Sequence, residues 1–107
     1  MPVMKKSLFT LFLLFLAAPV FAATATWTDT SNNEDGFIVE KRNGAVFVEI
    51  GRTATNVATM TVSIAAGQTG CYQVRSYNTA GVSAPSNEAC CTVPTLPSAP
   101  TNMVVTP

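Results

Sequence analysis

The sequence predicts an all-β protein, an antiparallel β-sandwich, on three observations. Short stretches of alternating side chains recur about every 8–12 residues, which is the spacing of sandwich strands. Gly, Asn, Asp and Pro, the residues that favour turns, are concentrated between these stretches. After residue 22 the chain contains no stretch with the spacing of an amphipathic helix.

The first 22 residues have the features of a secretory leader. Lys5 and Lys6 precede an apolar run over residues 8–18, and a short segment ending in Ala22 follows. This pattern predicts a signal peptide over residues 1–22, cleaved after Ala22. Because the apolar run is too short to span a bilayer comfortably, we expect a secreted or periplasmic protein without stable membrane insertion after cleavage. An uncleaved anchor is the alternative.

The composition excludes several functional classes. The chain has 107 residues and no His, so Cys/His and Ser/His nucleophile pairs are excluded, and three Cys without His make a poor zinc site. Loss of Lys5 and Lys6 with the leader leaves four basic and six acidic residues, a net charge of −2. Nucleic-acid binding needs a clustered basic face, so we expect none. With no paired-carboxylate site either, we expect no enzymatic activity, no cofactor and no metal.

Residues 23–28 form the first expected strand. Small or aromatic residues alternate with Thr, and Trp27 is expected in the core because burying so large a ring dominates a small core. The polar cluster at residues 29–36 predicts a turn. The alternative is calcium binding by the carboxylates of this cluster, Asp29, Glu34 and Asp35, although their spacing matches no dedicated calcium loop.

Four further strands are expected, at residues 37–42, 45–50, 58–64 and 71–77. Asn43-Gly44 predicts a hairpin between the first two. Alternation places four apolar side chains in the core, Phe37, Val39, Tyr72 and Val74. Asn78-Thr79-Ala80-Gly81 then ends the strand, because Asn and Gly tolerate the backbone of a turn.

The motif Val74-Arg75-Ser76-x-Asn78-x-x-Gly81-x-Ser83-x-x-Ser86 resembles the F–G signature of fibronectin type III domains, in the form common in secreted bacterial proteins. The resemblance covers residues 23–93. It implies an immunoglobulin-like β-sandwich of six strands, B to G, with strand A absent and Trp27 as the family's core Trp. Gly70 stands where the family carries the Tyr of the tyrosine corner, so that hydrogen bond is expected to be missing.

The same resemblance implies which cysteines form a disulfide. It places Cys71 at the start of strand F, and Cys90 and Cys91 in strand G, with Cys90 facing Cys71. We therefore expect a Cys71–Cys90 disulfide, which export permits. The sequence by itself leaves the other pairing of Cys71 open. Cys91 is expected to be a buried small hydrophobe, and a free or intermolecular thiol is the alternative.

Residues 94–107 read as a Pro-rich linker followed by a short strand at residues 102–106, similar to strand A of a following or neighbouring domain. Returning to its own domain would need about 30 Å, while Thr92 to Pro97 spans about 20 Å. Donation to a neighbouring copy would give head-to-tail self-association. The simpler alternative is a piece of a longer multidomain protein.

Together these expectations predict a class of function. As the resemblance implies, we expect an exported, non-enzymatic binding or spacer module with a protein or glycan partner. Two alternatives remain, a self-assembling surface or structural protein built by strand donation, and an accessory domain of a polysaccharide-degrading system. Nothing in the sequence identifies a ligand, since fold alone does not confer function.

Overall fold

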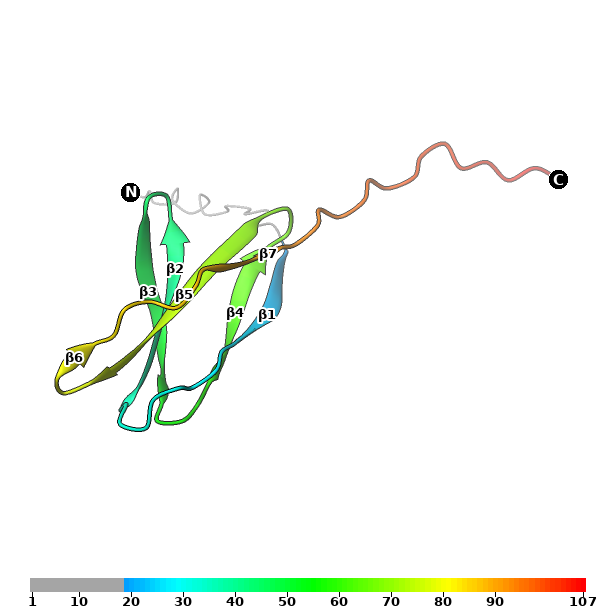
Figure 1. The fold of residues 1–107 in the computed structure, drawn as a ribbon. Helices are drawn as coiled ribbons and strands as arrows, with labels where there is room; N and C mark the ends of the chain where they lie inside the picture. The colour runs from blue at the N-terminus through cyan, green and yellow to red at the C-terminus, as the bar shows by residue number, and fades with distance from the viewer. Residues whose placement is uncertain (1–18) are drawn as a thin grey trace, which may run out of the picture.

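The computed structural model describes residues 19–107, which form two antiparallel sheets and no helix, as the sequence predicts (Figure 1). The described residues therefore include no helix that could cross a membrane. The smaller sheet pairs β1 (Val20–Thr26) with β4 (Thr59–Ala65). The larger, curled sheet contains β3 (Val46–Ala54), β2 (Gly36–Asn43), β5 (Thr69–Asn78), β6 (Gly81–Val82) and β7 (Ala89–Thr92).

The first strand begins earlier than the sequence suggests. β1 starts at Val20, which pairs with Ala65, and its last pair is Thr26 with Thr59. The N–H of Trp27 continues the ladder by donating to the Ala58 carbonyl at 3.2 Å. The expected cleavage point after Ala22 thus lies inside β1, while residues 1–18 of the expected leader lie outside the described residues.

The β2–β3 hairpin turns one residue later than predicted. Asn43 still belongs to β2 and pairs with Val46, so the two-residue loop is Gly44-Ala45 rather than Asn43-Gly44. Gly44 takes a φ of 70°, the backbone that a two-residue hairpin loop with Gly at its first position requires. The Asn-Gly pair identified the hairpin correctly, and the Gly set its register.

β5 is the central strand of the larger sheet. One edge pairs with β2, and the other pairs first with β7 and then, further along the strand, with β6. Between β6 and β7 the chain keeps contact through serines. The Ser83 N–H donates to the Ser76 carbonyl at 2.9 Å, and the Ser86 N–H donates to the Val74 carbonyl at 2.8 Å.

The two serine hydroxyls complete the edge of β5. Ser83 Oγ accepts from the Ser76 N–H, and Ser86 Oγ accepts from the Val74 N–H, each at 3.0 Å. Pro85 lies between them and has no N–H to donate to a ladder. At this edge of β5 the two serine hydroxyls therefore accept the hydrogen bonds that the backbone carbonyls of a regular strand would accept.

The core lies between the two sheets. Four buried side chains from β2, β4 and β5 form its central cluster: Val39, Val62, Ile64 and Tyr72. Trp27 and Val74 are partly buried and pack against this cluster. Phe37 is also buried, and its ring meets Trp27 edge-on with centroids 5.5 Å apart. The five side chains expected in the core thus lie in or against one apolar layer.

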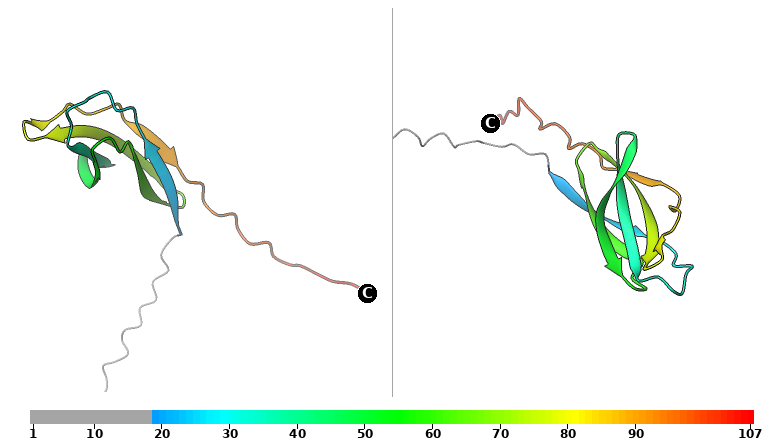
Figure 2. Two further views of the ribbon diagram at one scale, coloured as in Figure 1. Left: turned by 90° about the horizontal axis from the view of Figure 1, so that it is seen from below. Right: turned by 90° about the vertical axis from the view of Figure 1, so that its left-hand side faces the viewer.

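Residues 94–107 extend away from the sheets and form no strand (Figures 1 and 2). Residues 102–106 form no strand in the single chain, and their pairing as strand A of a following or neighbouring domain stays a prediction. A strand needs a neighbour for its backbone hydrogen bonds, and no described element lies beside this segment. Asn102 also takes a φ of 56°, which interrupts extended backbone.

Candidate functional site

The outer face of the larger sheet carries three arginine–glutamate pairs. Their shortest N–O distances are 2.8, 2.8 and 3.0 Å, for Arg42–Glu88, Arg52–Glu49 and Arg75–Glu40 respectively. The first pair is bidentate, with both contacts at 2.8 Å. Hydrogen bonding to Arg42 lowers the pKa of Glu88, so the pair stays ionised at neutral pH. Each arginine already has a carboxylate, which leaves little free charge on this face for an anion.

Aromatic rings and aliphatic stems cover the same face. The guanidinium of Arg52 lies 4.8 Å from the centre of the Tyr77 ring. Gly36 makes room for that ring, because a Cβ there would approach it to 3.1 Å. Ile38 pairs with Arg52 on one side and Arg75 on the other and is only 5% exposed, which long arginine stems explain. Alternation along β2 assigns Ile38 to the outer face, so the sequence alone does not predict its burial.

Glu34 organises the loop before β2. It is only 5% exposed although it lies in a polar loop. Its Oε1 accepts from the Ser31 hydroxyl at 2.7 Å, and its Oε2 accepts from the Asn56 N–H at 3.1 Å. Turned so that its nitrogen faces the carboxylates, the Asn56 side chain also donates to Glu34 and to Asp29. Glu34 therefore joins its own loop to the turn between β3 and β4.

The hydrogen bonds of Glu34 bear on the alternative that this loop binds calcium. The hydrogen bond from Ser31, then those from the backbone N–H groups of Glu34 and Asn56, lower the pKa of Glu34. Its oxygens therefore already have protein donors. Among residues 19–107 one trio of potential metal ligands lies within mutual reach, Cys71, Glu88 and Cys90. That trio does not include Asp29, Glu34 or Asp35.

The expected Cys71–Cys90 disulfide is present, between directly paired residues of β5 and β7. The two sulfur atoms of the trio are therefore oxidised and do not act as thiolate ligands. Glu88, the third member, is held by Arg42. The structure thus gives this cluster a structural role in joining two strands.

Cys91 is free and exposed, so the expectation that it is buried was wrong. Its register partner on β5 is Gly70, which offers no side chain to cover it. Instead the Tyr72 ring lies against Gly70, where a Cβ would come within 2.6 Å of the tyrosine hydroxyl. Burial, with a smaller effect of Cys91, raises the pKa of Tyr72.

A groove of about 550 Å³ separates β1 from β7 and the segment before it. In Figures 1 and 2 these two strands run near each other on one side of the molecule. The core forms the floor, with Val39, Val62, Ile64, Tyr72 and Val74. Trp27 and Cys91 line the walls. Two buried polar atoms of the lining residues have no hydrogen-bond partner, Trp27 Nε1 and Tyr72 Oη.

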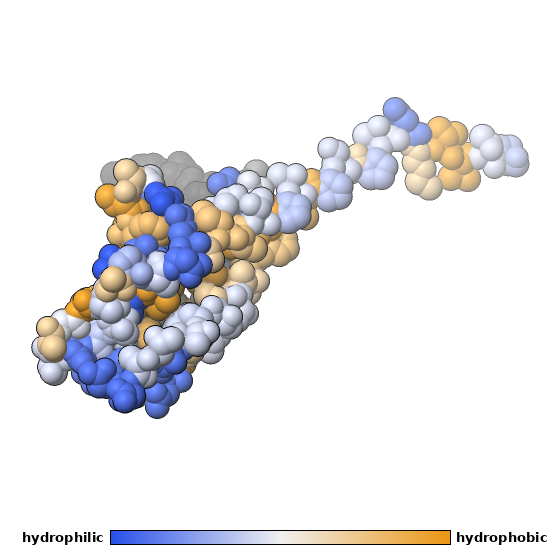
Figure 3. All heavy atoms as spheres, in the orientation of Figure 1, coloured by the Kyte–Doolittle hydropathy of each residue, from blue (hydrophilic) through white to orange (hydrophobic). Residues whose placement is uncertain are grey.

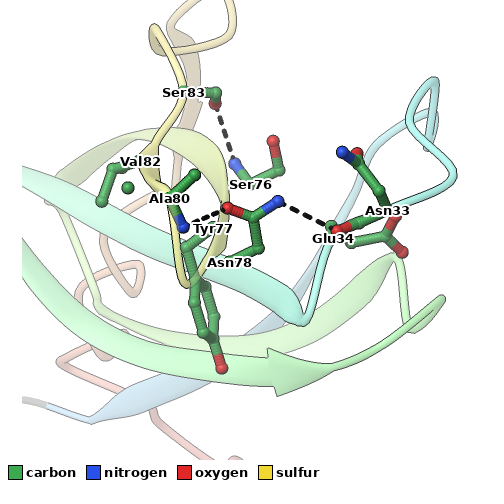
Figure 4. A pocket seen from close by; sticks show the side chains of 9 residues that line it. Asn33, Glu34, Ser76, Tyr77, Asn78, Ala80, Val82 and Ser83 are labelled. Carbon is green, nitrogen blue, oxygen red and sulfur yellow. Dashed lines mark hydrogen bonds between the residues drawn. The ribbon is translucent and has the colours of Figure 1, made fainter.

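A second, smaller hollow of about 300 Å³ lies beside the β5–β6 turn (Figure 4). The Asn78 side chain closes one side by donating to the Asn33 carbonyl at 3.1 Å and accepting from the Ala80 N–H at 2.8 Å. Ser83 accepts from Ser76 on the other side. Because these polar atoms already have partners, the hollow offers a ligand fewer unsatisfied groups than the groove does.

Comparisons with protein-family models and with curated proteins give no match for this chain. Function is therefore inferred from the residues and contacts themselves. Of the surfaces described, the groove beside β1 combines apolar area with polar groups that lack partners. Such a combination is what binding sites usually present. The groove depends on the distance between the two sheets, which the sequence alone does not predict.

Proposed function

We propose that the chain is an exported, non-enzymatic binding or spacer module with an immunoglobulin-like β-sandwich of fibronectin type III kind. The observation that carries this proposal is a folded β body joined to an extended connector (Figure 1). The connector contains Pro94, Pro97 and Pro100, which favour a stiff, extended chain. This arrangement suits a domain that holds or spaces other groups.

The strand arrangement supports the fibronectin type III part of the proposal. The larger sheet has the order β3-β2-β5 with β7 on β5, and the smaller pairs β1 with β4. This distribution of strands between the two sheets agrees with a sandwich of six strands, B to G, without strand A. The serines of the F–G motif also have a physical role here, because Ser83 and Ser86 bond to β5.

The contacts also support a non-enzymatic role. The sequence has no His, and the glutamates of the larger sheet are occupied by arginines or by Gln73. Hydrogen bonding from Gln73 and Arg75 lowers the pKa of Glu40, so this group favours the ionised form rather than a proton-donating one. A protein or a glycan is the partner class that such a module would hold.

Export is tested by expressing the full chain in a bacterial host and measuring the intact mass of the periplasmic or secreted protein without reductant. We expect a product that begins at Ala23 and is two hydrogens lighter than the fully reduced chain. Recovery of the uncleaved, fully reduced chain in the cytosol would contradict the proposal.

Binding to glycans is tested with the same purified protein on insoluble cellulose and chitin. Retention in the pellet would favour the accessory role in polysaccharide degradation. Absence of the protein from both pellets would leave a protein-binding or spacer module as the better description.

A further inference from the structure

We propose that the groove between β1 and β7 receives the C-terminal segment Met103–Thr106 of a second copy of this chain, added as a strand to the free edge of β1. This inference goes beyond the module proposed above and does not depend on its partner class. Two properties of the acceptor and two of the donor carry it.

The first acceptor property is an unpaired strand edge. The Ala66 N–H donates to the Pro19 carbonyl, and the Trp27 N–H donates to the Ala58 carbonyl, so residues 19 and 27 direct backbone groups toward β4. Backbone direction alternates along an antiparallel strand. Thr24 and Thr26 therefore direct their N–H and C=O groups away from β4, and among residues 19–107 β1 has no other neighbour in its sheet.

The second acceptor property is the exposed floor beside that edge. Core residues line the groove, and the Tyr72 hydroxyl, on a side chain more than nine-tenths buried, has no partner. An added strand would lie about 4.8 Å from β1, over this floor. The site therefore offers an added strand both unpaired backbone groups on β1 and an uncovered apolar surface in the groove.

The donor segment is apolar and unpaired. Met103, Val104 and Val105 are 87%, 75% and 81% exposed, and Figure 3 shows hydrophobic atoms gathered near the far end of the tail. In extended backbone Met103 and Val105 share one face, and Val104 lies on the other. The face with two large apolar side chains is the one expected to enter the groove.

The start of the tail favours donation to another copy. The Val93 N–H donates to the Gln68 carbonyl, and the Gly67 N–H donates to the Val93 carbonyl. These bonds hold Val93 beside the turn that follows β4, at the end of the molecule where β1 begins. To lie antiparallel to β1 of its own molecule, the tail would have to run the length of β1 and reverse, across a linker stiffened by prolines.

One donor segment and one acceptor groove per copy make a heterologous contact. Such contacts repeat head to tail and build open chains rather than closed dimers. The added strand would also cover Cys91, which lines the groove and is exposed in the single chain.

The test measures assembly by size-exclusion chromatography with light scattering, on the exported protein carrying Cys91→Ser so that no disulfide can link copies. We expect concentration-dependent oligomers. Val105→Asp should abolish them, because it places a charge on the inward face, whereas the matched control Val104→Asp should leave them. Monomers at every concentration up to the solubility limit, or equal effects of the two substitutions, would overturn the proposal.

The acceptor is tested with Thr24→Pro, which removes an N–H from the free edge, against Thr24→Val, which keeps it. Circular dichroism establishes that each variant is folded. Thr24→Pro should abolish oligomers, and mixing it with Val105→Asp should restore a dimer with one junction. Failure of that mixture to form a dimer would contradict donation between copies.

Thiol labelling provides a second readout in the protein with native Cys91. Maleimide should modify Cys91 slowly in oligomers and rapidly in the Val105→Asp variant. A monomer whose Cys91 is protected would instead indicate insertion of the tail into its own groove and would overturn the proposal.

Discussion

Glu34 shows how one buried carboxylate connects loops that are distant in the sequence. Ser31 lies in its own loop, whereas Asn56 lies in the turn between β3 and β4 and takes a φ of 63°. The Asn56 N–H and its strained backbone are held in place by the carboxylate. A local acidic residue in a polar loop gives no sequence signal for this role, because the partner is 22 positions away.

The substitution Glu34→Gln should lower the free energy of unfolding at pH 7. It should also make that free energy change less with pH in the acidic range. Hydrogen bonds lower the pKa of Glu34 below its ordinary value of 4.5. A lowered folded-state pKa contributes stability that is present above the unfolded-state pKa and is lost as pH falls through the folded-state value. Urea unfolding followed by Trp27 fluorescence, from about pH 3 to pH 7, measures this contribution.

The control for Glu34→Gln is Asp35→Asn, at an exposed carboxylate of the same loop. If both substitutions change the slope with pH equally, the effect comes from general charge rather than from the Glu34 hydrogen bonds.

At the scale of elements, the edge of β5 depends on two serine side chains. A regular strand would satisfy the N–H groups of Val74 and Ser76 with backbone carbonyls, but Ser83 and Ser86 do so with hydroxyls. Each hydroxyl also donates onward, Ser83 to the Ala84 carbonyl and Ser86 to the Asn87 carbonyl, both at 2.8 Å. The segment is irregular, yet its polar groups are bonded.

Substitution Ser86→Ala should cost about 1 kcal/mol in unfolding free energy, the net contribution of one hydrogen bond. Ser86→Thr keeps the hydroxyl and should cost less. Chemical denaturation of both variants measures the difference. A Ser86→Ala protein as stable as the parent would show that water replaces the hydroxyl at this exposed edge.

Local chemistry predicted the elements better than it predicted their environment. Alternation identified the strands, and the Asn43-Gly44 pair identified the hairpin, because both signals depend on neighbouring residues. The exposure of Cys91 and the pairing of residues 102–106 instead depend on which residues, distant in the sequence or in another copy, lie beside them. The same limit applies to the groove, whose floor combines residues from β2, β4 and β5.

For the whole molecule, the disulfide joins the last strand to the centre of the larger sheet. β7 has four residues and, among the residues that the structure describes, pairs with β5 alone, so few backbone bonds hold it. The Cys71–Cys90 bond closes a loop with a sequence separation of 19. The same loop carries β6 and both serines, so one covalent bond restrains the whole edge.

Replacing both cysteines with Ser should lower the free energy of unfolding by about 3 kcal/mol, as expected for a loop of this length. The matched control is Cys91→Ser, which removes a thiol from the neighbouring position and should leave stability nearly unchanged. Urea unfolding of the two proteins measures the difference. Equal stability of the parent and the double variant would show that β7 needs no covalent restraint.

The position of Val20 at the start of β1 connects folding to maturation. Cleavage after Ala22 would remove the part of β1 that pairs with residues 63–65. The precursor would then have the longer strand but, in a reducing cytosol, no disulfide, whereas the mature protein would have the disulfide and a shorter strand. Maturation would therefore remove the backbone pairing of three residues at the start of β1 and add one covalent bond between β5 and β7. The precursor would be stabilised more by its N-terminal strand, and the mature protein more by the disulfide in its C-terminal half.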